Sequence, residues 1–303
     1  MKHKTKKFFC FLIGLFLLFS LIGYANEEVV TEKELAEEWF NKAKEATSQE
    51  LKIEYYSEAI DIDPKYIDAY INRAIAYFNL KEYQMAIDDY TRAIRLKPKD
   101  ANIYNRRGVS YYNLKEYQKA ITDYTTAIKL DPTNALYCRN RGQAYFYFNE
   151  YQKAVDDFTK AIELAPQDAA NYDWRGYTYQ KMGEYQKAMA DYTRAIKIVP
   201  DKASYYNSRG NAFYSLGEYL KALADYSRAL EFDPQYAWAY NNRANTYVKL
   251  KNFNNKAVED YYQAAVFFLE QKNKNQASSC VEKIKELDPS FYLLEKLEAQ
   301  LKE

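Results

Sequence analysis

Six of the seven prolines in the chain follow one another at intervals of 34 residues, at Pro64, Pro98, Pro132, Pro166, Pro200 and Pro234. Repetition at a period between about 20 and 50 residues is the signature of stacked units that each bury a face against a neighbour. The sequence therefore predicts an array of repeats, and its length of 303 residues is a poor guide to the number of domains.

One repeat, residues 101–134, predicts two helices on either side of a turn at Lys115 and Glu116. Spacings of three and four residues place its apolar and small side chains on one face of each helix. Pro132 then ends the second helix, because proline offers no donor and the residue before it disfavours the α region. The first stripe contains Tyr104, Gly108 and Tyr111, and the second contains Ala120, Tyr124 and Ala127.

The small, aromatic and proline positions recur together in units that begin at Ile67, Ala101, Ala135, Ala169 and Ala203. This pattern resembles the tetratricopeptide repeat, over roughly residues 33 to 289. The resemblance implies an all-α fold, a right-handed superhelical solenoid of antiparallel helix hairpins with a concave groove. Glycine in a helix costs about 1 kcal/mol relative to alanine, so the in-helix glycines are expected at close helix contacts, whereas the turn glycines adopt a left-handed conformation. The in-helix glycines are Gly108, Gly142, Gly176 and Gly210, and the turn glycines are Gly183 and Gly217.

The units at the two ends of the array depart from this pattern. Residues 33–66 are interpreted as a degenerate first unit, with a Thr31–Glu34 capping box and a turn about three residues short. Residues 67–236 form five regular units, and residues 237–289 form irregular ones, in which Asn254-Asn255 adds one residue and a helix runs from Gln276 to Leu287. A last helix, residues 290–303, is expected to begin at Ser290 and to cap the final hydrophobic face.

The first 25 residues are interpreted as a signal peptide, with a basic start, an apolar stretch from Phe8 to Ile22 and a cleavage site after Ala25. A short linker, residues 26–32, follows. The chain is therefore expected to be exported, as a periplasmic or secreted protein. The alternative is an inner-membrane anchor over residues 8–26, which is long enough to span a bilayer with the repeats facing outward.

Composition argues against several classes of function. After residue 25 the chain carries 39 basic and 42 acidic residues, about −3 overall, and no basic block of the kind that nucleic-acid binding requires. Its only histidine is His3, and no cysteine pair has metal-ligand spacing. Cys138 and Cys280 are expected to be small core residues, four repeats apart. With no recognisable catalytic motif, we expect no enzymatic activity, no cofactor and no metal.

Arginines recur on the first helices and aspartates on the second, both on the inward stripes. A charge in such a place is costly unless it is paired, so we expect a ladder of structural Arg–Asp bridges within or between repeats. A row of anion-binding sites is the alternative. The arginines are Arg73, Arg107, Arg141, Arg175, Arg209 and Arg243, and the aspartates are Asp89, Asp123, Asp157, Asp191 and Asp225.

The sequence predicts a non-catalytic protein–protein interaction scaffold of the cell envelope, whose concave groove binds a peptide or protein segment. A structural or assembly factor that self-associates or works within an envelope complex is the alternative, and glycan binding by exposed tyrosines stays open. Core stripes repeat, while first-helix positions beside them vary between units, as recognition of one ligand requires. In the family these positions line the groove. Here they are Arg139, Gln143, Tyr147, Asp173, Tyr177, Lys181, Asn207, Asn211, Trp238, Asn241 and Asn245.

Overall fold

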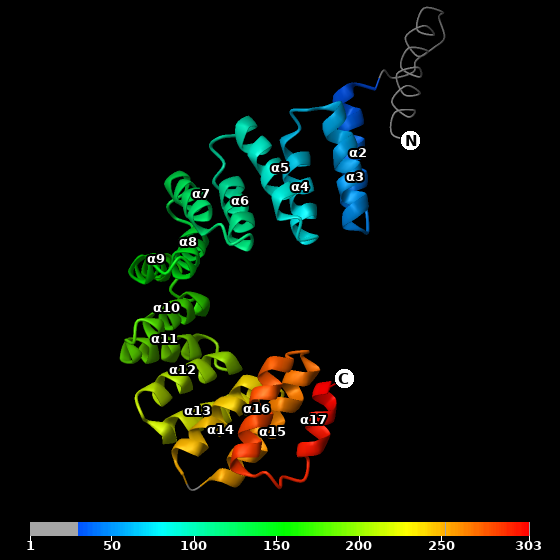
Figure 1. Ribbon diagram of the computed structural model, residues 1–303. Coiled ribbons are helices and arrows are strands. Elements are labelled where there is room, and N and C mark those ends of the chain that lie inside the picture. Colours follow the sequence, from blue (N-terminus) through cyan, green and yellow to red (C-terminus); the bar gives the residue numbers. More distant parts are fainter. Residues whose placement is uncertain (1–29, 252, 303) are drawn as a thin grey trace, which may run out of the picture. The chain divides into compact units, whose positions relative to one another are not determined.

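The computed structural model describes residues 30–251 and 253–302. The expected signal peptide, its cleavage site and the alternative membrane anchor lie outside these residues. Within them the chain forms sixteen helices, α2 to α17, and no strand (Figure 1). The expected all-α architecture of consecutive helix pairs is therefore confirmed.

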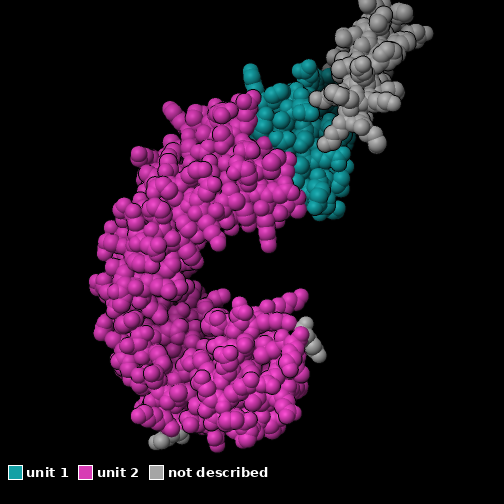
Figure 2. All heavy atoms as spheres, viewed as in Figure 1, with its two compact units in different colours: residues 1–73 teal, residues 74–303 magenta. Residues whose placement is uncertain are grey.

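The chain divides into two compact units, residues 1–73 and residues 74–303 (Figure 2). In the first unit α2 (Glu32–Glu45) pairs with α3 (Gln49–Ile62), and α4 (Ile67–Asn79) begins. The Thr31–Glu34 capping box is confirmed, because the Thr31 backbone N–H donates to Glu34 Oε2 at 2.8 Å and the Glu34 N–H donates to Thr31 Oγ1 at 3.2 Å.

The prediction of a short turn in this first unit is wrong. Residues 46–48 separate α2 from α3, as many as separate α4 from α5 (Tyr83–Leu96). What differs is the chemistry of the turn. Ala46 is extended, with φ −61° and ψ 140°, and the Ser48 hydroxyl caps α3 by accepting from the Leu51 N–H at 3.2 Å. The usual turn residues are absent from this unit because α3 has a different N-cap, and no residue has been deleted.

The second unit repeats one hairpin, in which a 13-residue first helix is followed after three residues by a 14-residue second helix. Each second helix also packs on the next first helix. The complete pairs are α6 (Ala101–Asn113) with α7 (Tyr117–Leu130), α8 (Ala135–Tyr147) with α9 (Tyr151–Leu164), α10 (Ala169–Lys181) with α11 (Tyr185–Ile198), and α12 (Ala203–Ser215) with α13 (Tyr219–Phe232). They follow α5 (Tyr83–Leu96).

Each of these turns contains one residue in the left-handed region. Gly183 has φ +79° and Gly217 φ +76°, as expected, while Lys115 and Asn149 adopt nearly the same conformation in their units. In the turn after α10 the Glu184 N–H donates to the Tyr179 carbonyl at 2.9 Å and the Gly183 N–H to the Gln180 carbonyl at 3.1 Å. These two bonds form a Schellman motif, which satisfies the last carbonyls of the first helix.

The in-helix glycines mark the closest approach of the paired helices. A Cβ placed on Gly108 would lie 2.7 Å from Tyr124 Cε1, and one placed on Gly142 would lie 2.8 Å from Phe158 Cε1. The two rings are fully buried. Small residues recur at this position because the aromatic ring of the second helix fills the space that a side chain would occupy.

The expected Arg–Asp ladder is confirmed in the second unit. The Arg141 guanidinium donates from Nε and Nη2 to the two carboxylate oxygens of Asp157, at 2.8 and 2.7 Å. Its third donor, Nη1, reaches Thr125 Oγ1 of the preceding hairpin at 3.0 Å. Each arginine therefore connects its own hairpin to the one before it. Equivalent pairs are Arg107–Asp123, Arg175–Asp191, Arg209–Asp225 and Arg243–Asp260.

The C-terminal helices are irregular, as expected. The turn between α14 (Ala237–Lys249) and α15 (Asn254–Glu270) is one residue longer than the others, and α16 (Lys274–Leu287) begins two residues before the predicted Gln276. The last helix, α17, is Leu294–Lys302, so the prediction that it begins at Ser290 is wrong.

The start of the last helix is delayed by a local turn. The Asp288 carboxylate accepts from the Ser290 backbone N–H at 3.0 Å and from its hydroxyl at 2.7 Å, which holds this segment out of the helix. Within α17, Leu294 and Leu297 join the buried cluster around Phe268 and Ile284.

None of the helices that the structure describes is long and apolar enough to cross a membrane.

Candidate interaction surface

The first helices of the second unit share one face of the array. Besides their hairpin partners, α6 packs on α8, α8 on α10, α10 on α12 and α12 on α14. Figure 2 shows this unit hollowed on one side, and in Figure 1 the helices α6, α8, α10 and α12 lie nearer the hollow than α7, α9, α11 and α13. The first helices therefore line the concave side of residues 74–303. All the candidate residues belong to first helices.

Three of the candidates are exposed aromatic side chains on the first helices. The exposed fractions are 45% for Tyr147 of α8, 38% for Tyr177 of α10 and 41% for Trp238 of α14. A folded chain gains by burying such rings, so their exposure provides apolar area for a partner.

Tyr147 and Tyr177 belong to an aromatic cluster that crosses three hairpins. The Tyr147 ring stacks on Tyr117 at 5.7 Å between centroids, and Trp174 lies 6.4 Å from Tyr147 and 6.2 Å from Tyr177. Phe146, which is buried, lies 5.0 Å from Tyr177. Other rings therefore pack against both exposed rings and restrict their orientation in the unbound protein.

Trp174 and Phe146 were not among the predicted site residues, although the sequence contained a signal for the first of them. Trp174 occupies a first-helix position that holds Asn140 one unit earlier and Ser208 one unit later. This is the unit-to-unit variation that selected the other candidates.

The amide candidates Asn211 and Asn245 already accept hydrogen bonds within the chain, which the sequence did not indicate. Asn211 accepts a hydrogen bond from the Tyr226 hydroxyl at 2.8 Å, and Asn245 accepts from the Tyr261 hydroxyl at 2.7 Å and from Lys283 Nζ at 3.0 Å. Both are half-buried. Their oxygens anchor core tyrosines, so these residues serve the packing of the array at least as much as its surface.

Asn207 and Asn241 do not lie on an accessible surface, which corrects that part of the prediction. Both are buried, with exposed fractions of 7% and 9%. Asn207 Oδ1 accepts from Asn242 Nδ2 at 3.0 Å, and Asn241 Oδ1 lies 3.7 Å from the Cys280 thiol, which donates to it. Because first helices pack on one another at this position, the amides join neighbouring units instead of facing a groove.

The remaining candidates carry charge or are polar. Arg139 forms an ion pair with Asp168 and donates to Asn171 Oδ1 at 3.2 Å, so it is engaged within the array. Lys181 is exposed, with Nζ 5.3 Å from the centre of the Tyr177 ring. Gln143 is half-buried.

Asp173, also half-buried, lies on α10 one turn before Tyr177. Burial raises the pKa of its carboxyl to about 6, an effect that Lys202 opposes.

The described residues offer little to a covalent or metal-dependent reaction. Cys138 and Cys280 are both buried free thiols, as expected, and burial raises the pKa of Cys280 to about 11. A thiol with a raised pKa is a weak nucleophile at neutral pH. Residues 30–251 and 253–302 contain no group of three His, Cys, Asp or Glu side chains that could hold a metal ion.

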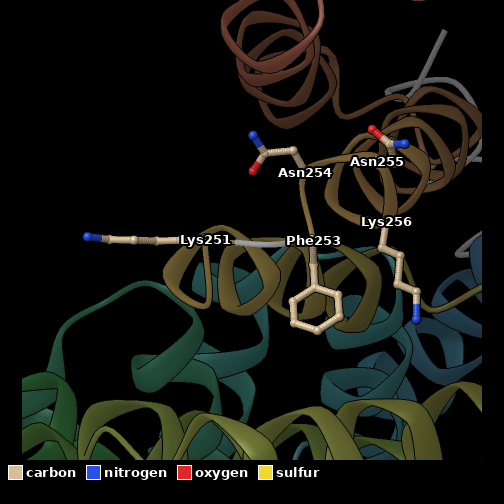
Figure 3. Close-up of a pocket in the computed structure, with 5 residues that line it drawn as sticks. All are labelled: Lys251, Phe253, Asn254, Asn255 and Lys256. Atoms are coloured by element: carbon tan, nitrogen blue, oxygen red, sulfur yellow. The ribbon is translucent and has the colours of Figure 1, made fainter.

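A shallow pocket is found at the long turn between α14 and α15. It is lined by Lys251, Phe253, Asn254, Asn255 and Lys256, whose side chains diverge from one another (Figure 3). A binding site needs polar groups that converge on one ligand, and this arrangement lacks them.

The fold and this surface define an α-helical repeat solenoid. Models described as tetratricopeptide repeat match residues 67–100, 101–134, 135–168 and 158–190, and a model described as TPR repeat matches residues 181–217 and 210–251. Together these matches run without a gap from residue 67 to residue 251, more than half of the chain. The chain belongs to the tetratricopeptide repeat family.

Solved structures share the fold. A MamA protein is similar at 27% identity, over 56% of this chain and 93% of its own, with a TM-score of 0.52. A tetratricopeptide repeat protein of Parabacteroides merdae is 19% identical over 88% of this chain and 99% of its own, with a TM-score of 0.63, and PilF of Pseudomonas aeruginosa is 17% identical over 77% and 97%, with a TM-score of 0.55. No curated protein matches the chain significantly in sequence.

Proposed function

We propose that the chain is a non-catalytic scaffold that binds a protein or peptide segment along the concave side of its second unit. Tetratricopeptide repeats present such concave surfaces to protein partners in general. The observation that carries the proposal here is the set of exposed rings on first helices, Tyr147, Tyr177 and Trp238, two of which are held in place by buried or half-buried aromatic neighbours. Rigid aromatic side chains give binding energy at low entropic cost.

The Arg–Asp ladder supports a structural role for the charges beneath this surface. In each of the five pairs of the second unit, an arginine donates two hydrogen bonds to one carboxylate and a third to a hydroxyl. Guanidinium groups engaged in this way have few donors left for an added anion. We therefore place recognition on the variable residues and not on the ladder.

A crosslinking experiment tests this placement of the site. A photoreactive phenylalanine analogue replaces Tyr177 on α10 in one strain and Leu220 on α13, which is 73% exposed, in another. Illumination of intact cells, followed by mass spectrometry of the adducts, should identify one or a few proteins that crosslink from position 177 and not from position 220. Equal crosslinking from both positions would contradict the proposal.

We also propose that the protein works in the cell envelope, after export directed by residues 1–25. The basic, apolar and small-residue order of that segment supports this proposal. Fractionation of the cell, with mass determination of the purified chain, tests it. A mature mass that begins at Asn26 supports cleavage, an uncut chain in the membrane fraction supports the anchor over residues 8–26, and recovery of the uncut chain from the cytoplasm would overturn the export proposal.

Self-association is the second candidate function, favoured by the recurrence of the same helix pair along the array. Light scattering on the eluting peak of a sizing column distinguishes the two. A scaffold that binds other proteins should elute at the mass of one chain over a wide range of concentration, whereas an assembly factor that stacks on itself should grow in mass as its concentration rises.

A further inference from the structure

Five first helices place a polar residue at the same position of the repeat, and four of these residues are satisfied by the array itself. Asn105 accepts from Asn140, Arg139 pairs with Asp168, Asn207 accepts from Asn242, and Asn241 accepts from the Cys280 thiol. In every case the partner belongs to the following helix pair or to the segment that leads into it. The position is therefore built for contacts between neighbouring units.

Asp173 is the fifth residue of this set, and it is the exception. Within residues 30–251 and 253–302 its carboxylate has no hydrogen bond and no ion pair, although it is half-buried. A desolvated carboxylate without a partner is costly, and proteins usually pair it. The other four residues of this set all have partners within the array, so the fold can provide an internal partner at this position.

Three tyrosines lie within electrostatic range of Asp173. Its charge acts on the hydroxyl groups of Tyr192 of α11, Tyr205 of α12 and Tyr236 in the segment before α14. Tyr177 lies on the same face of α10, one turn further on. Lys202, just before α12, acts on this carboxylate through its charge but forms no ion pair with it, and its side chain is exposed to solvent. The Asp173 carboxylate offers an incoming cation an ion pair, and the exposed ring of Tyr177 one turn away offers it a ring face.

We propose that Asp173, with Tyr177 one turn away on the same helix, is the subsite on the concave surface that receives a lysine or arginine side chain of the bound segment. The proposal rests on the proposed function and specifies the chemistry of its partner. The incoming cation would give the Asp173 carboxylate the partner that the other four residues of the set find within the array. The neighbouring Tyr177 would contact the rest of the segment.

A peptide selection tests the subsite. A library of random heptapeptides is selected against the full-length protein, and the bound sequences are compared with those selected by Asp173→Asn and Asp173→Lys variants. The wild-type protein should enrich lysine or arginine at one fixed position, Asp173→Asn should lose that preference, and Asp173→Lys should exchange it for acidic residues. Asp156→Asn, an exposed aspartate on α9, is the matched control and should keep the wild-type preference.

Affinities of one selected peptide refine the test. Replacing its basic residue by glutamine, or Asp173 by asparagine, should each weaken binding on the order of tenfold, and the two changes together should weaken it no further, as expected for two groups that contact each other. Binding should also weaken between pH 7.5 and pH 5, where the carboxylate gains a proton, and this loss should be absent in Asp173→Asn.

The outcomes separate the two proposals. Selected peptides without a basic residue, or peptides that bind Asp173→Asn as tightly as the wild-type protein, would overturn the subsite while leaving the concave surface in place. Peptides whose binding survives removal of Tyr147, Tyr177 and Trp238 would overturn the proposed function itself. A wild-type protein that selects no peptide would contradict both.

Discussion

The guanidinium of Arg141 holds both carboxylate oxygens of Asp157 and also reaches Thr125 in the preceding hairpin. One side chain thus ties the two helices of a repeat together and fixes the repeat to its neighbour. The hydrogen bonds that Arg141 donates to Asp157 raise the pKa of the guanidinium, which keeps it charged. The same arrangement recurs in five units of residues 74–303.

Removing the arginine should therefore destabilise the array. Arg141→Ala leaves Asp157 buried and without its partner, and breaking such a buried pair costs about 3 to 5 kcal/mol. Urea unfolding measures the loss. Arg228→Ala, which breaks the exposed pair with Glu231, is the control and should leave the free energy of unfolding almost unchanged. Equal effects of the two substitutions would show that the ladder adds no more than a surface ion pair.

The contact between Gly108 and Tyr124 predicts a non-additive pair of substitutions. Tyr124→Ala removes a fully buried ring and should cost about 3 to 5 kcal/mol. Gly108→Ala places a methyl group 2.7 Å from that ring and should cost about 1 to 3 kcal/mol. The double variant should lose less than the sum, because the clash vanishes with the ring. Strict additivity in urea melts would show that the two positions do not touch.

The left-handed turn residues predict substitutions of opposite sign. Gly183→Ala forces a Cβ into a turn with φ +79° and should destabilise the protein by about 1 kcal/mol. Asn149→Gly and Lys115→Gly remove a Cβ at the same turn position, where φ is 63° and 62°, and should cost nothing or stabilise the protein slightly. Thermal melts followed by circular dichroism provide the comparison, and a Gly183→Ala protein as stable as the wild type would contradict it.

Asp173 predicts a pH dependence of stability. Its carboxyl has a pKa of about 6 in the folded chain and an ordinary value of 3.8. Between these values the folded chain binds the proton and the unfolded chain does not, so the free energy of unfolding falls as the pH rises from about 4 to 6. The fall due to this group is at most about 3 kcal/mol.

Urea unfolding at pH 4 and pH 7 isolates this contribution. Other groups titrate alike in the wild-type protein and in Asp173→Asn, so the difference between the two pH dependences belongs to Asp173. The variant should lose less stability than the wild type over this range. Identical pH dependences would mean that the carboxyl has its ordinary pKa in the folded chain.

Much of the fold could be predicted from the sequence because each repeat presents the same evidence again. Glycines without room for a side chain, left-handed turn residues and prolines after second helices recur at fixed spacing, so each unit confirms the interpretation of the next. The prediction failed where the repetition stops. The turn of the first unit kept its length but changed its cap to Ser48, and Asp288 delayed the last helix.

The one-residue insertion near Asn254 had a further consequence. It moved the partner of Arg243 one residue beyond the expected spacing, to Asp260. The predicted series of aspartates therefore omitted this residue. Because spacing alone selected the ladder, an altered spacing concealed the last pair.

The candidate surface was predictable only in outline. Variation between units located the exposed Tyr147, Tyr177 and Trp238, but it also selected Asn207 and Asn241, which are buried. A position can vary because it faces a partner or because it adapts to the next helix of the array, and the sequence cannot distinguish these two causes. Burial separates them, since the second kind of residue finds its hydrogen-bond partner within the chain.

The central claim is that the exposed rings of the first helices bind the partner, and the dissociation constant of a selected peptide measures this most directly. Tyr147→Ala, Tyr177→Ala and Trp238→Ala together should weaken binding by about 100-fold or more, the loss expected when hot-spot aromatics are removed. The control triple, Met85→Ala, Leu220→Ala and Tyr292→Ala, removes three apolar side chains elsewhere that are at least as exposed, and it should bind like the wild-type protein. If both triples keep their helical melting curves and the first still binds with wild-type affinity, the concave surface is not the binding site.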